Sequence, residues 1–83
     1  MSQDAISCEL HDFIEVACMY GYQVRLELKD QQVFEGKARD ITTSEKREYL
    51  IISNEQQQQQ VELTQLVRMQ VLTPNARFTE VNF

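Results

Sequence analysis

Basic residues are absent from the first 24 positions of this 83-residue chain, whose first lysine or arginine is Arg25. The same segment carries four carboxylates, so most of the net charge of -5 lies at the amino-terminal end: Asp4, Glu9, Asp12 and Glu15. The other 59 residues, with nine acids and eight bases, are close to neutral. Nucleic-acid phosphates must be met by cations. This acidic end is therefore poorly suited to RNA or DNA and well suited to a basic partner surface.

Histidine, cysteine and glycine are also scarce, which argues against catalysis and against a bound metal or nucleotide. A catalytic arrangement would have to combine the single histidine, His11, with Ser7 or Cys8, and their spacing along one helix prevents convergence on a substrate atom. One histidine and no CxxC pair do not make a zinc site. Two glycines cannot form a phosphate-binding loop. We expect no enzyme, no catalytic residue, no cofactor and no metal.

The two cysteines, Cys8 and Cys18, lie ten positions apart. On one helix they would be separated by about 15 Å along its axis, too far for a disulfide, and we expect both to be buried as small apolar side chains. Apolar runs approaching the ~20 residues of a membrane span are missing, as is an export signal. We expect a cytoplasmic protein that does not enter a membrane.

The pattern along the chain predicts a single domain over residues 1–83. We expect a mobile leader at 1–6, an acidic helix at 7–21, barrel strands at 22–72 and a carboxyl-terminal tail at 73–83. Ser7 can cap the helix, and Gly21 can end it. The apolar positions of the helix have the spacing of one buried face: Leu10, Phe13, Ile14, Ala17 and Cys18.

After the helix the apolar pattern changes, which indicates strands at 22–29, 33–41, 49–52, 58–63 and 66–72. The first of them alternates with period two, whereas 49–52 is apolar on both faces and is expected to be central. Gly36 inside the second strand suggests a bend or bulge. The fold class expected is α+β, mainly β: an amino-terminal helix that covers one end of a small five-stranded antiparallel barrel. The tail is apolar enough to lie on the sheet or to pair at its edge.

The outer face of the expected helix carries Asp12 and Glu15, three residues apart, with Met19 one turn further on. These carboxylates form either a solvated acidic face or a surface that binds a partner. His11 is expected to be solvent-exposed or capping, with an interface role left open. The glutamine run at 56–60 is interpreted as part of a polar hairpin. Four bases have acids interleaved with them, so any positive patch is weak: Lys37, Arg39, Lys46 and Arg47.

The segment 24–36, Val-Arg-Leu-Glu-Leu-Lys-Asp-Gln-Gln-Val-Phe-Glu-Gly, resembles the first motif of Sm-like proteins. That resemblance implies a five-stranded barrel behind an amino-terminal helix. It also keeps open an alternative function, that of an Sm-like RNA-binding ring protein.

A second resemblance covers most of the chain and rests on five segments that match without insertions. They are Ile6-x-Cys8, Asp12-x-Ile14-Glu15-x-Ala17-Cys18, Val24-x-Leu26-Glu27-Leu28-Lys29-Asp30, Lys37-Ala38-x-Asp40 and Glu48-Tyr49-Leu50. Together they resemble the Rho-binding antiterminator family, also called Rof. The resemblance implies an Sm-like barrel that inhibits the transcription termination factor Rho by binding its amino-terminal RNA-binding region.

Carried over residue by residue, the resemblance implies a set of partner-binding positions. Asp12 and Glu15 match acidic positions that face Rho, and Glu9 stands where the family tends to have an acid. Lys46 falls in a loop that resembles part of the same contact surface, and His11 stands where an aromatic can occur. We expect a protein that is monomeric when free, binds Rho, and contacts no nucleic acid directly.

Overall fold

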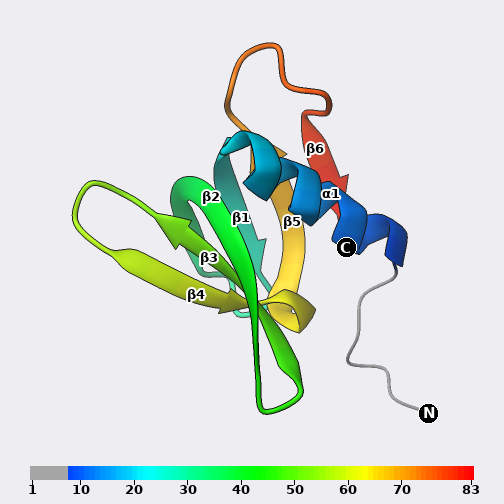
Figure 1. Ribbon diagram of the computed structural model, residues 1–83, viewed down its shortest axis with the longest axis vertical. Coiled ribbons are helices and arrows are strands. Elements are labelled where there is room, and N and C mark those ends of the chain that lie inside the picture. The colour runs from blue at the N-terminus through cyan, green and yellow to red at the C-terminus, as the bar shows by residue number, and fades with distance from the viewer. Residues whose placement is uncertain (1–7) are drawn as a thin grey trace.

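The computed structural model describes residues 8–83, without the side chain of Cys8, and contains one helix followed by strands (Figure 1). The expected leader at 1–6 and the capping role of Ser7 lie outside the described residues. The expected order, a helix and then antiparallel strands, is confirmed. The elements are α1 (Cys8–Tyr20), β1 (Gln23–Leu28), β2 (Val33–Ser44), β3 (Arg47–Ser53), β4 (Gln58–Glu62), the 3-10 turn η1 (Leu63–Gln65), β5 (Leu66–Val71) and β6 (Glu80–Asn82).

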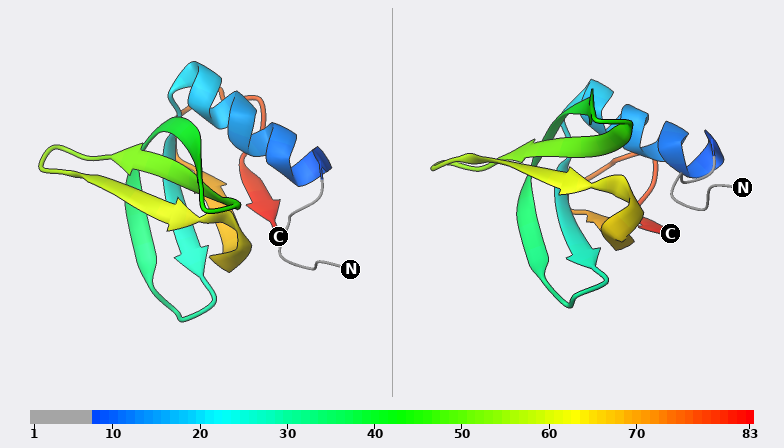
Figure 2. Two further views of the ribbon diagram at one scale, coloured as in Figure 1. Left: turned by 60° about the horizontal axis from the view of Figure 1, so that its bottom comes forward. Right: turned by 90° about the horizontal axis from the view of Figure 1, so that it is seen from below.

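The strands form one antiparallel sheet in the order β4-β3-β2-β1-β5-β6. The sheet curls around its own core while α1 lies across one end (Figure 2). Two expectations differ from the structure. Within residues 8–83 no pairing joins β4 to β6, so hydrogen bonds do not close a barrel. The sheet also has six strands, because the tail supplies β6, whose Val81 is buried opposite Met69.

The core forms where the inward faces of the strands meet α1. In β1, Val24 and Leu26 are fully buried while Arg25 between them is exposed, as period-two alternation requires. From the helix, Ile14 and Ala17 have no exposed surface. The other apolar helix positions pack partly buried against the same cluster: Leu10, Phe13, Val16 and Cys18. The packed face of α1 therefore determines that its acidic face points outward.

The helix ends at Gly21, as the sequence predicts, in a Schellman motif. The N–H of Gly21 donates to the carbonyl of Cys18 at 3.2 Å, and the N–H of Tyr22 donates to that of Ala17 at 2.9 Å. Gly21 has φ of 64°, in the left-handed region that a residue without a Cβ occupies without strain. This turn directs Tyr22 into the core, where it is buried.

Strand β2 contains a bulge, but not at the expected position. The register between β2 and β3 shifts between Ala38 and Asp40, which makes Arg39 the extra residue. Gly36 has a different role, because a Cβ there would lie 2.8 Å from the backbone oxygen of Ser53 on β3. The glycine thus allows close approach of two strands, and the bulge three residues later changes which side chains face inward.

The two glycines predict an order of stability. Gly21→Ala should lower the free energy of unfolding by about 1 kcal/mol through its left-handed φ and a clash with the flexible end of Lys37. Gly36→Ala should cost more, about 2–3 kcal/mol, because the new methyl group meets backbone that cannot rotate away. Urea denaturation of both variants measures the difference. Equal stability of Gly36→Ala and the parent would contradict the close approach of β2 and β3.

Candidate functional site

The outer face of α1 carries three exposed carboxylates, Glu9, Asp12 and Glu15, with Met19 at 73% exposure near the end of the helix. Glu9 lies in the first helical turn, where the positive end of the helix dipole favours an anion. Among residues 8–83, neither Glu9 nor Asp12 forms an ion pair. This face therefore presents negative charge that the described part of the chain leaves unneutralised.

His11 bridges the helix to the sheet. Its Nε2 lies 3.0 Å from Oε2 of Glu48 on β3, and its Nδ1 lies 3.4 Å from Oε2 of Glu15 one turn along the helix. Only 22% of the imidazole is exposed, so the expectation of an exposed or capping histidine is wrong. A neutral imidazole has one N–H and can donate to one carboxylate, whereas an imidazolium can donate to both. His11 thus orients Glu15 and ties α1 to β3.

A shallow hollow lies between α1 and the β2–β3 hairpin. Its lining includes three carboxylates, those of Glu15, Asp40 and Glu48, together with His11, Cys18, Met19, Arg39, Ile41 and Thr43. Burial, followed by the charges of Asp40 and Glu15, raises the pKa of the Cys18 thiol to about 11. The thiol therefore lies in a negative potential. The acidic character of the helix face continues across this hollow onto β2 and β3.

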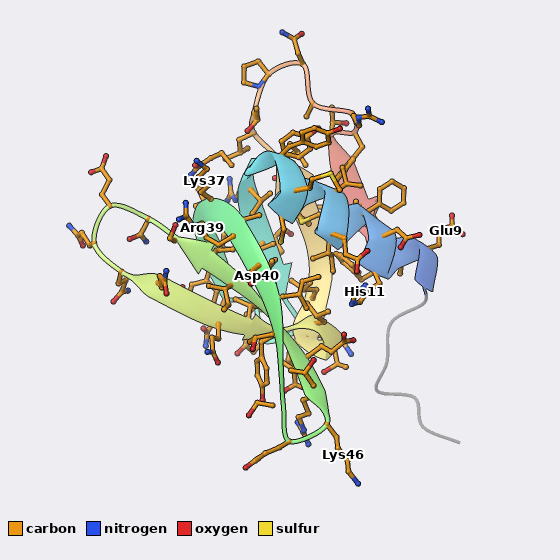
Figure 3. The ribbon with its side chains drawn as sticks, in the orientation of Figure 1. Glu9, His11, Lys37, Arg39, Asp40 and Lys46 are labelled. Atoms are coloured by element: carbon orange, nitrogen blue, oxygen red, sulfur yellow. The ribbon has the colours of Figure 1, made fainter. Side chains whose placement is uncertain are left out.

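Lys46 lies at the tip of the β2–β3 hairpin, apart from Glu9 and His11 (Figure 3). Ser44 pairs with Arg47, and the two residues between them have positive φ, 52° at Glu45 and 68° at Lys46. These angles form a two-residue turn of the type I′ kind, which points both side chains into solvent. The helix brings Glu9, Asp12, Glu15 and His11 together, whereas Lys46 stands at the end of a separate arm.

Two residues of this surface were missed from the sequence, Glu48 and Asp40. Glu48 lies on the same face of β3 as the buried residues Leu50 and Ile52, two and four positions further on. The sequence does not reveal which face of this strand is inward, because residues 49–52 are all apolar. The partner, His11, lies 37 residues earlier and could not be identified without the packing of α1.

The described part of the chain brings together neither a reactive nucleophile nor a set of metal ligands. His11 is engaged by carboxylates, and a thiol with a pKa near 11 is almost wholly protonated at neutral pH and a poor nucleophile. No group of three His, Cys, Asp or Glu side chains between residues 8 and 83 is arranged to hold a metal ion. None of the helices described there has the length and apolar character needed to cross a membrane.

Comparison with protein families gives a match over nearly the whole chain. Residues 5–83 match the family model described as "Modulator of Rho-dependent transcription termination (ROF)". The matched range includes α1 and every strand of the sheet.

Individual relatives agree with the family match. The chain is 36% identical over 47 residues to "Protein rof" of Escherichia coli (strain K12), and equally to that of Shigella flexneri. These alignments cover 57% of this chain and 56% of each relative, so the chain spans little more than half the length of the curated relatives it matches. A solved structure, "YaeO bound to Magnesium" from Vibrio cholerae O395, superposes with a TM-score of 0.81 at 32% identity, covering 87% of this chain and 95% of that one.

The bridge between His11 and Glu48 predicts thermodynamic coupling. In a double-mutant cycle with His11→Ala and Glu48→Gln, we expect a coupling of about 0.5–1 kcal/mol in unfolding free energy, modest because both groups are partly exposed. Guanidinium denaturation at neutral pH measures it. A matched cycle of His11→Ala with Glu35→Gln, whose carboxylate pairs with Arg25, should show none. Equal coupling in the two cycles would contradict the bridge.

The raised pKa of Cys18 predicts slow thiol chemistry. In a Cys8→Ser background, labelling by a thiol reagent at pH 8 should be at least about tenfold slower in the folded than in the unfolded protein, because only the thiolate reacts. A folded pKa above the unfolded one also means that stability falls as pH rises from about 9 towards 11. Asp40→Asn should speed the labelling by removing one of the charges that raise the pKa. Rapid labelling of the folded parent at pH 8 would contradict the prediction.

Proposed function

This chain belongs to the Rof family of modulators of Rho-dependent transcription termination, and we propose that it inhibits Rho by covering its RNA-binding surface. The outer face of α1 binds the basic primary RNA site in the amino-terminal domain of Rho, and transcripts then fail to load. The interaction takes place in the cytoplasm and requires neither a cofactor nor catalysis. Its supporting observation is the exposed set of carboxylates on α1, of which Glu9 and Asp12 form no ion pair within residues 8–83 and Glu15 pairs only with His11 there.

The chemistry of single-stranded RNA binding explains why a carboxylate face can compete with a transcript. A site that holds RNA combines a cationic groove for the phosphates with surfaces for stacking bases. Asp12 and Glu15 stand on one helix face about 4.5 Å apart along the axis, and both are exposed. They offer anionic oxygens to arginine or lysine side chains that otherwise bind phosphates. The inhibitor then imitates the charge of RNA but not its bases.

Glu9, His11 and Lys46 contribute to the proposed binding in three different ways. Glu9 extends the carboxylate row to the start of α1, where it adds attraction at the margin. His11 contributes mainly by holding Glu15 and by fixing the helix against Glu48, which makes it a positioning residue. Lys46 lies on an exposed turn apart from the helix. Its ammonium group contacts Rho independently of α1 and donates to a carboxylate or a carbonyl oxygen there.

Long-range attraction supports the same docking. A net charge of -5 with a concentrated acidic end steers the protein toward a cationic surface and raises the association rate at low salt. Three arginines of the sheet lie beside acids: Arg25 beside Glu35, Arg47 beside Glu62, and Arg68 beside Glu27 and Glu80. The electrostatic attraction to a basic partner therefore acts mainly through the carboxylates of α1.

The alternative, an RNA-binding ring, is less well supported. A ring built by adding the strand edges of successive copies to one another needs two long free edges in each copy. Here β6 pairs with β5 and leaves only three residues at that edge. The same acidic face that favours a basic protein opposes RNA.

Charge reversal on α1 tests the proposal. Asp12→Lys combined with Glu15→Lys should weaken Rho binding by about 100-fold or more, since each lost charge-assisted hydrogen bond contributes about 1.5–3 kcal/mol. Binding can be followed by titrating labelled protein with Rho, and function by displacement of RNA from Rho. Circular dichroism checks that the variant folds.

The matched control makes the same charge change away from α1, on strand β2 and in the β3–β4 loop. Glu35→Lys with Glu55→Lys alters two exposed carboxylates outside α1 and should leave binding within a few-fold of the parent. A salt series adds a second criterion, because exposed charges are screened beyond about 8–10 Å at physiological ionic strength. Undiminished RNA displacement by the folded α1 variant, or a complex insensitive to salt, would overturn the acidic-face mechanism.

A further inference from the structure

Strand β4 forms an open edge of the sheet. It stands first in the strand order and pairs only with β3 among the described residues. The N–H of Asn54 donates to the carbonyl of Gln57 at 2.9 Å, which starts the hydrogen-bonded alternation of the hairpin. By that alternation, Gln59 and Val61 direct their backbone groups to β3. Gln58, Gln60 and Glu62 therefore direct theirs outward, away from the sheet.

This edge lacks the features that usually protect an exposed strand. Such features are charged side chains, proline or a bulge. Residues 58–60 are three glutamines, and the pairing with β3 is regular along the strand. The one charge, Glu62, is already engaged by Thr64 and Arg47, whose contacts hold the pKa of its carboxyl below the usual value. The edge is thus uncharged over most of its length and ready to accept another strand.

We propose that this edge is a self-association surface, on which β4 of a second copy pairs antiparallel to β4 about a two-fold axis at Gln60. In that register Gln60 faces Gln60 of the second copy, and Gln58 faces Glu62 of the second copy. Both of these facing pairs consist of residues whose backbone groups point outward, so each pair exchanges hydrogen bonds in both directions, and the pair of Gln59 with Val61 between them is a non-hydrogen-bonded one. No carboxylate stands opposite another. Facing glutamine amides can also bond to one another, as in stacked strands.

A second copy of this chain, related by a two-fold axis, is the partner that best fits the β4 edge. A surface that pairs with its own copy must be self-complementary, and this one is so in both backbone pattern and charge. The tip of the β3–β4 hairpin projects away from α1 in the views of Figures 1 and 2. The acidic face of each copy therefore stays exposed in the dimer. The proposal does not rest on the binding of Rho.

Charge sets the conditions under which the dimer forms. Two copies of net charge -5 repel at low ionic strength, although the edge itself carries little of that charge. Salt screens the repulsion, so self-association should strengthen as salt rises. This is the opposite of the salt dependence expected for docking through α1. At low concentration the chain remains monomeric, because a single short strand pair is a small interface.

Sedimentation equilibrium of the full chain over a range of protein concentrations, at low and high salt, measures this association. Gln60→Pro removes an N–H that points away from β3, and Gln60→Lys places two like charges at the axis; each should weaken the dimer about tenfold or more. Gln65→Lys, an exposed glutamine outside β4, is the matched control and should leave it unchanged. A single monomer mass at high salt, or equal association of all variants, would overturn the proposal.

Cross-linking tests the register without depending on a destabilising change. In a Cys8→Ser, Cys18→Ser background, Gln60→Cys would bring two thiols to a facing pair about 5.5 Å apart between Cα atoms, within disulfide range. Oxidised glutathione should then give a disulfide-linked dimer, with two thiols oxidised and one glutathione disulfide reduced. Gln65→Cys should give little. Equal cross-linking at both positions, or none at Gln60→Cys, would contradict the two-fold register.

Discussion

The burial of Ile14 and Ala17 determines what this protein can present to a partner. Both side chains are fully enclosed where α1 crosses the curled sheet, and this packing fixes the rotation of the helix about its axis. Asp12 and Glu15 then face solvent as a geometric consequence of helical spacing. Gly21 ends the helix in a Schellman turn that brings Tyr22 into the core, so the helix is anchored at its far end as well.

The distribution of ion pairs explains why the acidic face stands out in a chain with many acids. Arg25, Arg47 and Arg68 each lie beside a carboxylate of a neighbouring strand, and Arg68 contacts both Glu27 and Glu80. Exposed pairs of this kind contribute little to stability, typically about 0–1 kcal/mol each. Their effect is on the electric field, because each pair places opposite charges side by side. Within residues 8–83 no arginine or lysine lies beside the carboxylates of α1, so their charge faces an approaching molecule.

Local patterns in the sequence were sufficient for the helix, its end at Gly21 and the alternation of β1, since each depends on neighbouring residues alone. The exposed carboxylates Asp12 and Glu15 follow from the same helical period. The tail was expected to lie on the sheet or to pair at its edge, and it does pair there as β6, but its register, with Val81 buried opposite Met69 on β5, required the packed structure. The bulge at Arg39 and the bridge from His11 to Glu48 depend on the pairing of distant segments. No local period encodes such contacts, and these were the features predicted wrongly or missed.

The bulge also governs how β2 tolerates changes in length during evolution. Ala38 stands opposite Ile52 and Asp40 opposite Ile51, so Arg39 is surplus to an otherwise continuous ladder. A homologue lacking that one residue would keep Ile41 and Thr43 on the side that lines the hollow. An insertion or deletion elsewhere in the strand would invert their orientation unless a new irregularity absorbed it. Arg39 is therefore the position in β2 where a one-residue deletion would disturb the strand pairing least.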